Sequence, residues 1–209
     1  MRSANRSRRL DLKDFYYTVE SVTEKELIIN KSKFIATLMP VKSQLSIPEL
    51  INSVKKKHHS ASHHPYAFRV GLKNNTFRYN DDGEPSGSSG KPILEAIDKF
   101  NLTDVLCVVT RYFGGILLGI GGLRRAYFES AELSIRNSEI IEKVITKKLN
   151  IKFDYELINK VMNYLKQNNI KILENNSSDN AELICDVKIS FVEKFKSDLT
   201  ELSNGKIIL

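Results

Sequence analysis

Two glycine-rich turns, each placed between a predicted strand and a predicted helix, constrain the fold of this chain more than any other part of its sequence. The first turn is Gly-Glu-Pro-Ser-Gly-Ser-Ser-Gly-Lys-Pro at residues 83–92, and the second lies within residues 111–125 and contains five glycines. Glycine permits tight turns and close backbone approaches that other residues forbid. If the two strands share a sheet, the two turns can converge on one site.

The chain before residue 140 alternates between strand and helix patterns. Strands are expected at residues 15–22, 27–39, 66–72, 76–80 and 104–111, with turns at 23–26 and 73–75. Helices are expected at residues 46–57, 92–100 and 123–137. Ser46 and Glu49 have the spacing of a capping box. The strand at 104–111 is continuously apolar, which predicts burial on both of its faces.

A second pattern begins near residue 140. From there the sequence predicts strand, helix, strand, strand, helix and strand at residues 144–153, 155–168, 170–174, 181–190, 192–203 and 206–209. That βαββαβ order is the ferredoxin-like arrangement. The expected fold class is therefore α+β, with a disordered basic tail at 1–14, a first domain at 15–139 and a second at 140–209.

Charge and cysteine usage restrict the environment of the protein. The net charge is +7, and residues 1–145 carry most of it, with 22 Lys and Arg against 16 Asp and Glu. This excess favours an anionic partner such as nucleic acid. Cys107 and Cys185 lie in separate strand-like segments and are expected to be buried, reduced thiols of a cytoplasmic protein. No apolar run reaches the length of a membrane span, so no membrane association is expected.

The first turn ends at a predicted helix N-terminus, where free backbone N–H groups and the helix dipole attract anions. The candidate anion ligands in this turn are Gly87, Ser88, Ser89, Gly90 and Lys91. The turn is not a nucleotide P-loop, because Pro85 stands in place of the first glycine and Pro92 in place of the metal-binding Ser or Thr. The alternative is that the glycines only permit a tight connection between strand and helix.

The second turn offers arginines on both sides of its glycines. The candidate anion ligands here are Arg111, Gly114, Gly115, Arg124 and Arg125. Guanidinium groups bind phosphate through several donors at once. The glycine spacing is not that of a dinucleotide site, because Arg124 falls at the third glycine position. The alternative is that the arginines are solvated or pair with Asp81, Asp82 or Glu84.

Evidence for catalysis is sparse. His63 is a weak candidate for a general base, and Asp82 and Glu84 are weak candidates for holding magnesium. The four histidines between residues 58 and 64 lack the ligand spacing of a zinc site, so no metal site is predicted. No nucleophile–base pair and no cofactor motif are present. The sequence therefore favours a protein that is not an enzyme.

The sequence from residue 87 to 122 strongly resembles the signature of the IMPACT/YigZ family, with the turn Gly-Ser-Ser-Gly-Lys-Pro, an apolar strand, and then Arg-Tyr-Phe-Gly-Gly followed by Leu-Gly-Ile-Gly-Gly. Residues 31–35 and 63–67 are similar to two further family segments, although Pro65 stands where the family commonly has Cys. Residues 141–209 resemble the small C-terminal domain of the bacterial members.

The resemblance implies a first domain of the type shared by a ribosomal-protein domain, GHMP kinases and translation factors. It implies a ferredoxin-like second domain similar to the last domain of elongation factor G. Eukaryotic IMPACT proteins restrain an amino-acid-starvation kinase and so link stress to the regulation of translation. They do so with an additional N-terminal partner-binding domain that this sequence does not contain.

Three functions are compatible with these observations. The first is a translation-linked protein that binds RNA, the ribosome or another phosphate-bearing ligand through the two basic turns. The second is an enzyme that acts on a small phosphorylated or nucleotide substrate. The third is an adaptor for a protein partner, with Tyr112 and Phe113 as the interface.

Overall fold

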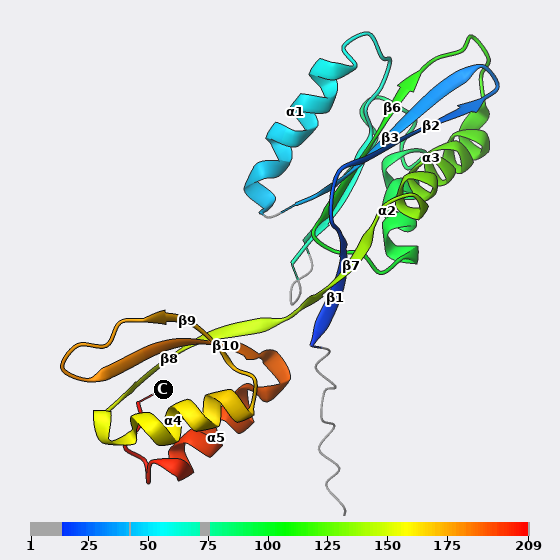
Figure 1. The fold of residues 1–209 in the computed structure, drawn as a ribbon. Helices are drawn as coiled ribbons and strands as arrows, with labels where there is room; N and C mark the ends of the chain where they lie inside the picture. Colours follow the sequence, from blue (N-terminus) through cyan, green and yellow to red (C-terminus); the bar gives the residue numbers. More distant parts are fainter. Residues whose placement is uncertain (1–13, 42, 72–75, 209) are drawn as a thin grey trace, which may run out of the picture. The chain divides into compact units, whose positions relative to one another are not determined.

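A computed structural model of the protein describes residues 14–41, 43–71 and 76–208. The chain divides into two compact units, one formed by Tyr16–Lys143 and the other mainly by the chain from Val144 onward (Figure 1). A short two-stranded sheet pairs β1 (Phe15–Val19) with β7 (Ile140–Val144). Apart from Asp14, the predicted basic tail lies outside the described residues.

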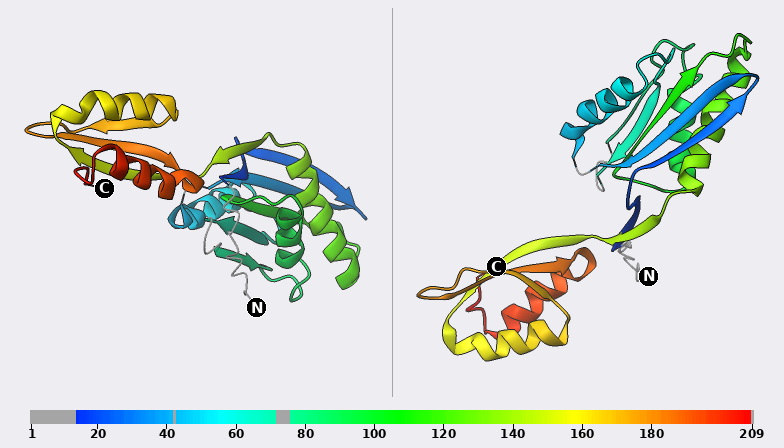
Figure 2. Two further views of the ribbon diagram at one scale, coloured as in Figure 1. Left: turned by 90° about the horizontal axis from the view of Figure 1, so that it is seen from below. Right: turned by 45° about the horizontal axis from the view of Figure 1, so that its top comes forward.

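The first unit is built on a five-stranded sheet in which every pair of neighbours is antiparallel. Its strand order is β2 (Thr23–Ile29), β3 (Ser32–Pro40), β6 (Val105–Tyr112), β4 (Tyr66–Val70) and β5 (Thr76–Asn80). Helix α1 (Ile47–Lys57) covers one face, and α2 (Gly90–Lys99) and α3 (Gly119–Arg136) cover the other (Figure 1; Figure 2). The unit therefore has three layers, with the sheet in the middle.

Strand β6 lies at the centre of this sheet, and seven of its eight residues are buried. Val105, Cys107 and Val109 belong to the core beneath α2 and α3, whereas Leu106 and Val108 belong to the core beneath α1. Each face thus requires its own apolar residues, which explains why the strand is continuously hydrophobic. The prediction of burial on both faces is confirmed.

Two local predictions in this unit are wrong. The predicted turn at 23–26 is part of β2, and the chain reverses at Asn30 and Lys31, whose φ angles are 45° and 64°. Two consecutive positive φ angles make the tight turn that fits the twist of a hairpin. Ser46 forms no capping bond, because it belongs to a 3₁₀ turn and its hydroxyl donates to the Ser43 carbonyl at 2.7 Å.

The second unit consists of β8 (Thr146–Phe153), α4 (Ile158–Gln167), β9 (Lys171–Asn175), β10 (Ala181–Lys188) and α5 (Val192–Leu202). Its sheet has the order β8-β10-β9, and both helices cover the same face (Figure 1). The side chains of β10 alternate between fully and partly buried, as a strand with one face on a core requires. The predicted last strand is represented by one bridge, between Ile208 and Lys152.

Both cysteines are buried and free of disulfide bonds. Burial raises the pKa of Cys107 to about 12 and that of Cys185 to about 11, so neither thiol is a reactive thiolate at neutral pH. Among the helices of the described residues, none is both long and apolar enough to cross a bilayer.

Candidate functional site where the two glycine turns meet

The two glycine-rich turns lie against each other at one end of the first unit. The first turn connects β5 to α2, the second connects β6 to α3, and β5 and β6 belong to the same sheet. Two contacts join them: Arg111 Nη1 lies 2.7 Å from Glu84 Oε1, and Arg124 Nη1 donates to the Gly87 carbonyl at 2.7 Å. Arg111 and Arg124 of the second turn therefore bind the first turn.

The carboxylate of Asp81 lies at the N-terminus of α2, where the first turn ends. It accepts the backbone N–H groups of Gly87, Ser89 and Gly90 at 2.8, 3.1 and 2.8 Å, and the Ser89 hydroxyl at 2.8 Å. Partial burial opposes ionisation, but these hydrogen bonds prevail and lower the pKa of Asp81 below its ordinary value. The donors predicted to bind an external anion thus already hold an internal one, and the Ser88 side chain is buried.

Replacing Asp81 with Ala is expected to destabilise the first unit by about 2 kcal/mol, because three backbone N–H groups lose their acceptor. Because the pKa of Asp81 is lowered in the folded state, its contribution to the free energy of unfolding is fully present above about pH 4. That contribution is lost as the pH falls through the folded-state pKa. Urea unfolding of Asp81→Ala at pH 7 and at pH 3 measures both effects. Glu129→Ala, which removes an exposed carboxylate from α3, is the control with a change near zero.

Close backbone approach accounts for the glycines at two of the predicted positions. A Cβ atom on Gly90 would lie 2.7 Å from the Asn80 carbonyl oxygen, and one on Gly114 would lie 2.0 Å from the Lys31 carbonyl carbon. Contacts under 3.0 Å require the neighbouring atoms to move. Glycine at these positions lets each turn pack against neighbouring backbone, which gives both glycines a structural role.

Arg111 lies at the centre of a buried polar cluster. Glu84 Oε1 accepts from Arg111 Nη1 at 2.7 Å and from the Tyr127 hydroxyl at 2.6 Å. Burial, with the charge of Glu84, raises the pKa of Tyr127, so its hydroxyl stays protonated and donates. Arg111 is 5% exposed, and its guanidinium carbon lies 5.6 and 5.4 Å from the ring centroids of Phe34 and Phe113. Arg111 is therefore a core residue neutralised by Glu84, which is one of the pairings that the sequence left open as an alternative.

A cavity of about 460 Å³ opens beside this cluster. Ser62, His63, Glu84 and Arg111 supply its polar wall. Its apolar wall comes from the second turn and the start of α3, and it consists mainly of Phe113, Leu117, Leu118, Ile120 and Leu123. Phe113, Leu117 and Ile120 are also 47%, 87% and 61% exposed. The sequence predicted a basic turn here, and of these exposed apolar residues only Phe113 was expected to belong to an interface.

The start of α3 differs from the start of α2. Asp81 accepts N–H groups at the start of α2, whereas among the described residues no side chain hydrogen-bonds to the first N–H groups of α3. Arg124 pairs with Glu95, both of whose carboxylate oxygens lie 3.1 Å from Arg124 Nη2. It also donates a hydrogen bond to the Gly87 carbonyl. Lys91 and Arg125 are exposed and form no ion pair within the described residues. They are the cations of the two turns that remain free.

The weak catalytic candidates are divided between two cavities, because His63 and Glu84 line the cavity at the turns and Asp82 lines another. Asp82 accepts the His64 N–H at 2.7 Å and pairs with Lys55 at 2.9 Å, so it borders a different cavity from Glu84. His63 Nδ1 lies 2.8 Å from the Asp82 carbonyl oxygen. Among the described residues, no three His, Cys, Asp or Glu side chains are arranged to hold a metal ion. Asp82 and Glu84 thus do not converge on one site.

His58 and Tyr112 form a contact that the sequence did not indicate. His58 is buried, and its Nδ1 lies 3.1 Å from the Tyr112 hydroxyl. Tyr112 is thereby held beside α1, whereas Phe113 borders the cavity at the turns. The two aromatic residues proposed as one interface therefore contact different parts of the unit.

Comparison with known proteins agrees with this two-part organisation. The family model of the Impact N-terminal domain matches residues 30–135, and that of a domain of unknown function (DUF1949) matches residues 151–206. The IMPACT family member YvyE of Bacillus subtilis is 38% identical over 191 residues, which is 91% of this chain and 88% of the relative. An IMPACT family member of Haemophilus influenzae is 32% identical over 196 residues, covering 93% and 95%.

A solved structure is also similar over its whole length. The crystal structure of a hypothetical protein matches with a TM-score of 0.69 and 27% identity, and the match covers 94% of this chain and 97% of that one. The chain therefore belongs to the IMPACT family.

Proposed function

We propose that this protein is a translation-linked regulator, not an enzyme, that binds RNA, within the ribosome or free of it, through the surface at the start of α3. Membership of the IMPACT family supports the link to translation, and the proposal places the protein in the cytoplasm. The observation that carries the proposal is the contrast between the two turns. Asp81 accepts N–H groups at the start of α2, whereas among the described residues no side chain caps the start of α3.

The start of α3 suits a phosphate-bearing polymer. Its first four residues are Gly119, Ile120, Gly121 and Gly122, so the backbone is accessible and its unpaired N–H groups carry the positive end of the helix dipole. Lys91 and Arg125 add two mobile cations at the surface. The exposed ring of Phe113 offers a face against which an unpaired base can stack. Phosphate contacts with base stacking are typical of binding to single-stranded RNA.

Removal of Lys91 and Arg125 is the direct test. The double variant Lys91→Ala/Arg125→Ala is expected to bind RNA about tenfold more weakly, and the slope of log affinity against log salt should fall by about 1.4, or about 0.7 for each phosphate that the protein no longer neutralises. Filter binding of labelled single-stranded RNA over a salt series measures both quantities.

The matched control is Lys25→Ala/Lys147→Ala, which removes two exposed lysines from β2 and β8 and so changes the net charge equally. If the test variant and the control variant bind alike, or if the wild-type protein does not bind RNA, the proposed site is wrong.

A protein partner is the second candidate function, and the exposed apolar side chains of Phe113, Leu117 and Ile120 favour it. Single apolar residues on a surface are ordinary, but a contiguous group is typical of an interaction site. A partner whose retention survives nuclease treatment, and is lost in Leu117→Glu/Ile120→Glu, would support this function over RNA binding.

A further inference from the structure

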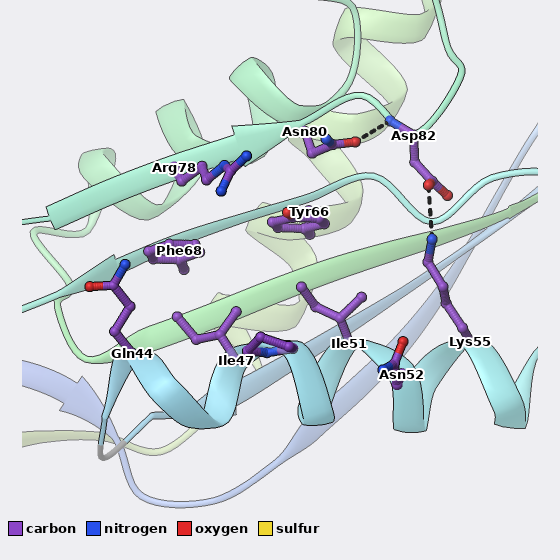
Figure 3. A pocket seen from close by; sticks show the side chains of 11 residues that line it. Gln44, Ile47, Ile51, Asn52, Lys55, Tyr66, Phe68, Arg78, Asn80 and Asp82 are labelled. Atoms are coloured by element: carbon purple, nitrogen blue, oxygen red, sulfur yellow. Dashed lines mark hydrogen bonds and ion pairs between the residues drawn. The ribbon is translucent and has the colours of Figure 1, made fainter.

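A second cavity of the first unit lies between α1 and the edge of the sheet (Figure 3). It has a volume of about 380 Å³. Ile47 and Ile51 project from α1 towards the sheet, and Tyr66 and Phe68 of β4 face them (Figure 3). We call this cavity the α1–β5 groove, because β5 is the edge strand of the sheet.

The aromatic part of the groove follows from the register of β4 and β5. Tyr66 is paired with Asn80, and Phe68 with Arg78, so these four side chains lie on the same face of the sheet. Phe68 is buried, whereas the ring of Tyr66 is partly exposed. Tyr66 therefore offers a flat apolar surface that a planar group can reach.

Carboxamide side chains also line the groove. Gln44 precedes α1, Asn52 lies on α1 and Asn80 ends β5, and all three are exposed. Asn80 Oδ1 accepts the Asp82 N–H at 2.7 Å, which leaves the amide NH₂ of Asn80 as a donor. Amides both donate and accept hydrogen bonds, as the edges of nucleobases do.

The charge of the groove is positive. Arg78 is exposed and has no ion-pair partner in the part of the chain that the structure describes. Lys55 and Asp82, which also line the groove, neutralise each other at 2.9 Å (Figure 3). Arg78 therefore remains as an uncompensated cation beside the aromatic surface.

We propose that the α1–β5 groove binds one nucleotide unit, with its base on Tyr66, the base edge against the carboxamides and its phosphate at Arg78. An aromatic ring, several amides and an unpaired guanidinium together match a base and its phosphate. The nucleotide is either free or part of single-stranded RNA. If the nucleotide is part of RNA, the groove is an additional contact for the RNA binding proposed above, and this inference rests on that proposed function. If the nucleotide is free, the inference is independent of it.

Isothermal titration of the full chain with AMP, UMP, and the ten-residue oligonucleotides of A and of U tests this site. Arg78→Gln and Tyr66→Leu are each expected to weaken binding about tenfold or more. Tyr79→Leu is the matched control for Tyr66→Leu, because Tyr79 lies on the opposite face of the same hairpin. Arg78 is exposed, so Arg78→Gln leaves the fold intact even if Tyr66→Leu does not.

The outcomes distinguish a free nucleotide from RNA, and they distinguish the groove from the RNA-binding surface at the start of α3. Binding of AMP or UMP that weakens in Arg78→Gln indicates a free nucleotide. Binding of the oligonucleotides alone that weakens in the same variant indicates RNA. If all four ligands fail to bind, or if binding is unchanged in Arg78→Gln and Tyr66→Leu, the groove is not a nucleotide site. If RNA binding depends on Lys91 and Arg125 but not on Arg78 or Tyr66, the proposed function stands and the proposal that the groove binds a nucleotide is wrong.

Discussion

The Glu84→Ala variant is expected to lose about 3–5 kcal/mol of stability in the first unit. The substitution leaves the Arg111 guanidinium buried without its counter-charge, and it also removes the acceptor of the Tyr127 hydroxyl. A loss of this size is a large fraction of the stability of a typical domain. Urea unfolding followed by far-ultraviolet circular dichroism measures it.

The triple variant Glu84→Leu/Arg111→Leu/Tyr127→Phe is the matched comparison. It removes all the charges and the hydroxyl of the cluster together, so no buried polar group is left unpaired, and much of the lost stability should return. If Glu84→Ala costs less than about 1 kcal/mol, Arg111 has access to water or to another acceptor, and its interpretation as a neutralised core residue is wrong.

The Gly114→Ala variant is expected to lose about 3 kcal/mol or to fail to fold. Its Cβ would lie 2.0 Å from the Lys31 carbonyl carbon and 2.4 Å from the Ser32 nitrogen, and both are backbone atoms of the β2–β3 hairpin. Because backbone atoms cannot rotate away as side chains do, the cost lies at the upper end of that for overpacking. Thermal unfolding and the yield of soluble protein report the effect.

Gly121→Ala is the control for this prediction. Gly121 lies in α3, and a Cβ atom there meets nothing within 4 Å. Since Ala is the better helix former, this variant should be as stable as the wild type or gain up to about 1 kcal/mol. Equal effects of the two substitutions would show that close approach does not determine the choice of glycine at position 114.

Local sequence patterns predicted most helices and strands of the first unit. The arrangement of its candidate site depends instead on contacts between residues far apart in the sequence. The apolar run of β6 and the periodicity of α1 are visible within a few neighbouring residues. The turn at Asn30 and Lys31 was missed because neither residue is a glycine or proline. A glycine turn at a helix start looks the same in sequence whether it binds a ligand or, as here, a carboxylate six to nine residues away.

The burial of Arg111 shows the same limit. Its partner, Glu84, is 27 residues away, and Tyr127 is 43 residues from Glu84, so no local pattern joins the three. Pairing with Glu84 was one of the alternatives that the sequence left open. The α1–β5 groove depends on the register of β4 and β5 together with the position of α1, and no motif in the sequence marks it.

The acidic segment from Asp81 to Glu84 has a mechanical consequence. Asp81 holds the start of α2, Asp82 holds α1 through Lys55, and Glu84 holds β6 and α3 through Arg111 and Tyr127. Asp82 lines the α1–β5 groove, and Glu84 lines the cavity at the turns. If a ligand in one cavity shifted this segment, it would also move the wall of the other cavity, and by thermodynamic linkage the effect on binding would be reciprocal. The segment from Asp81 to Glu84 thus connects the walls of the two cavities at which binding is proposed.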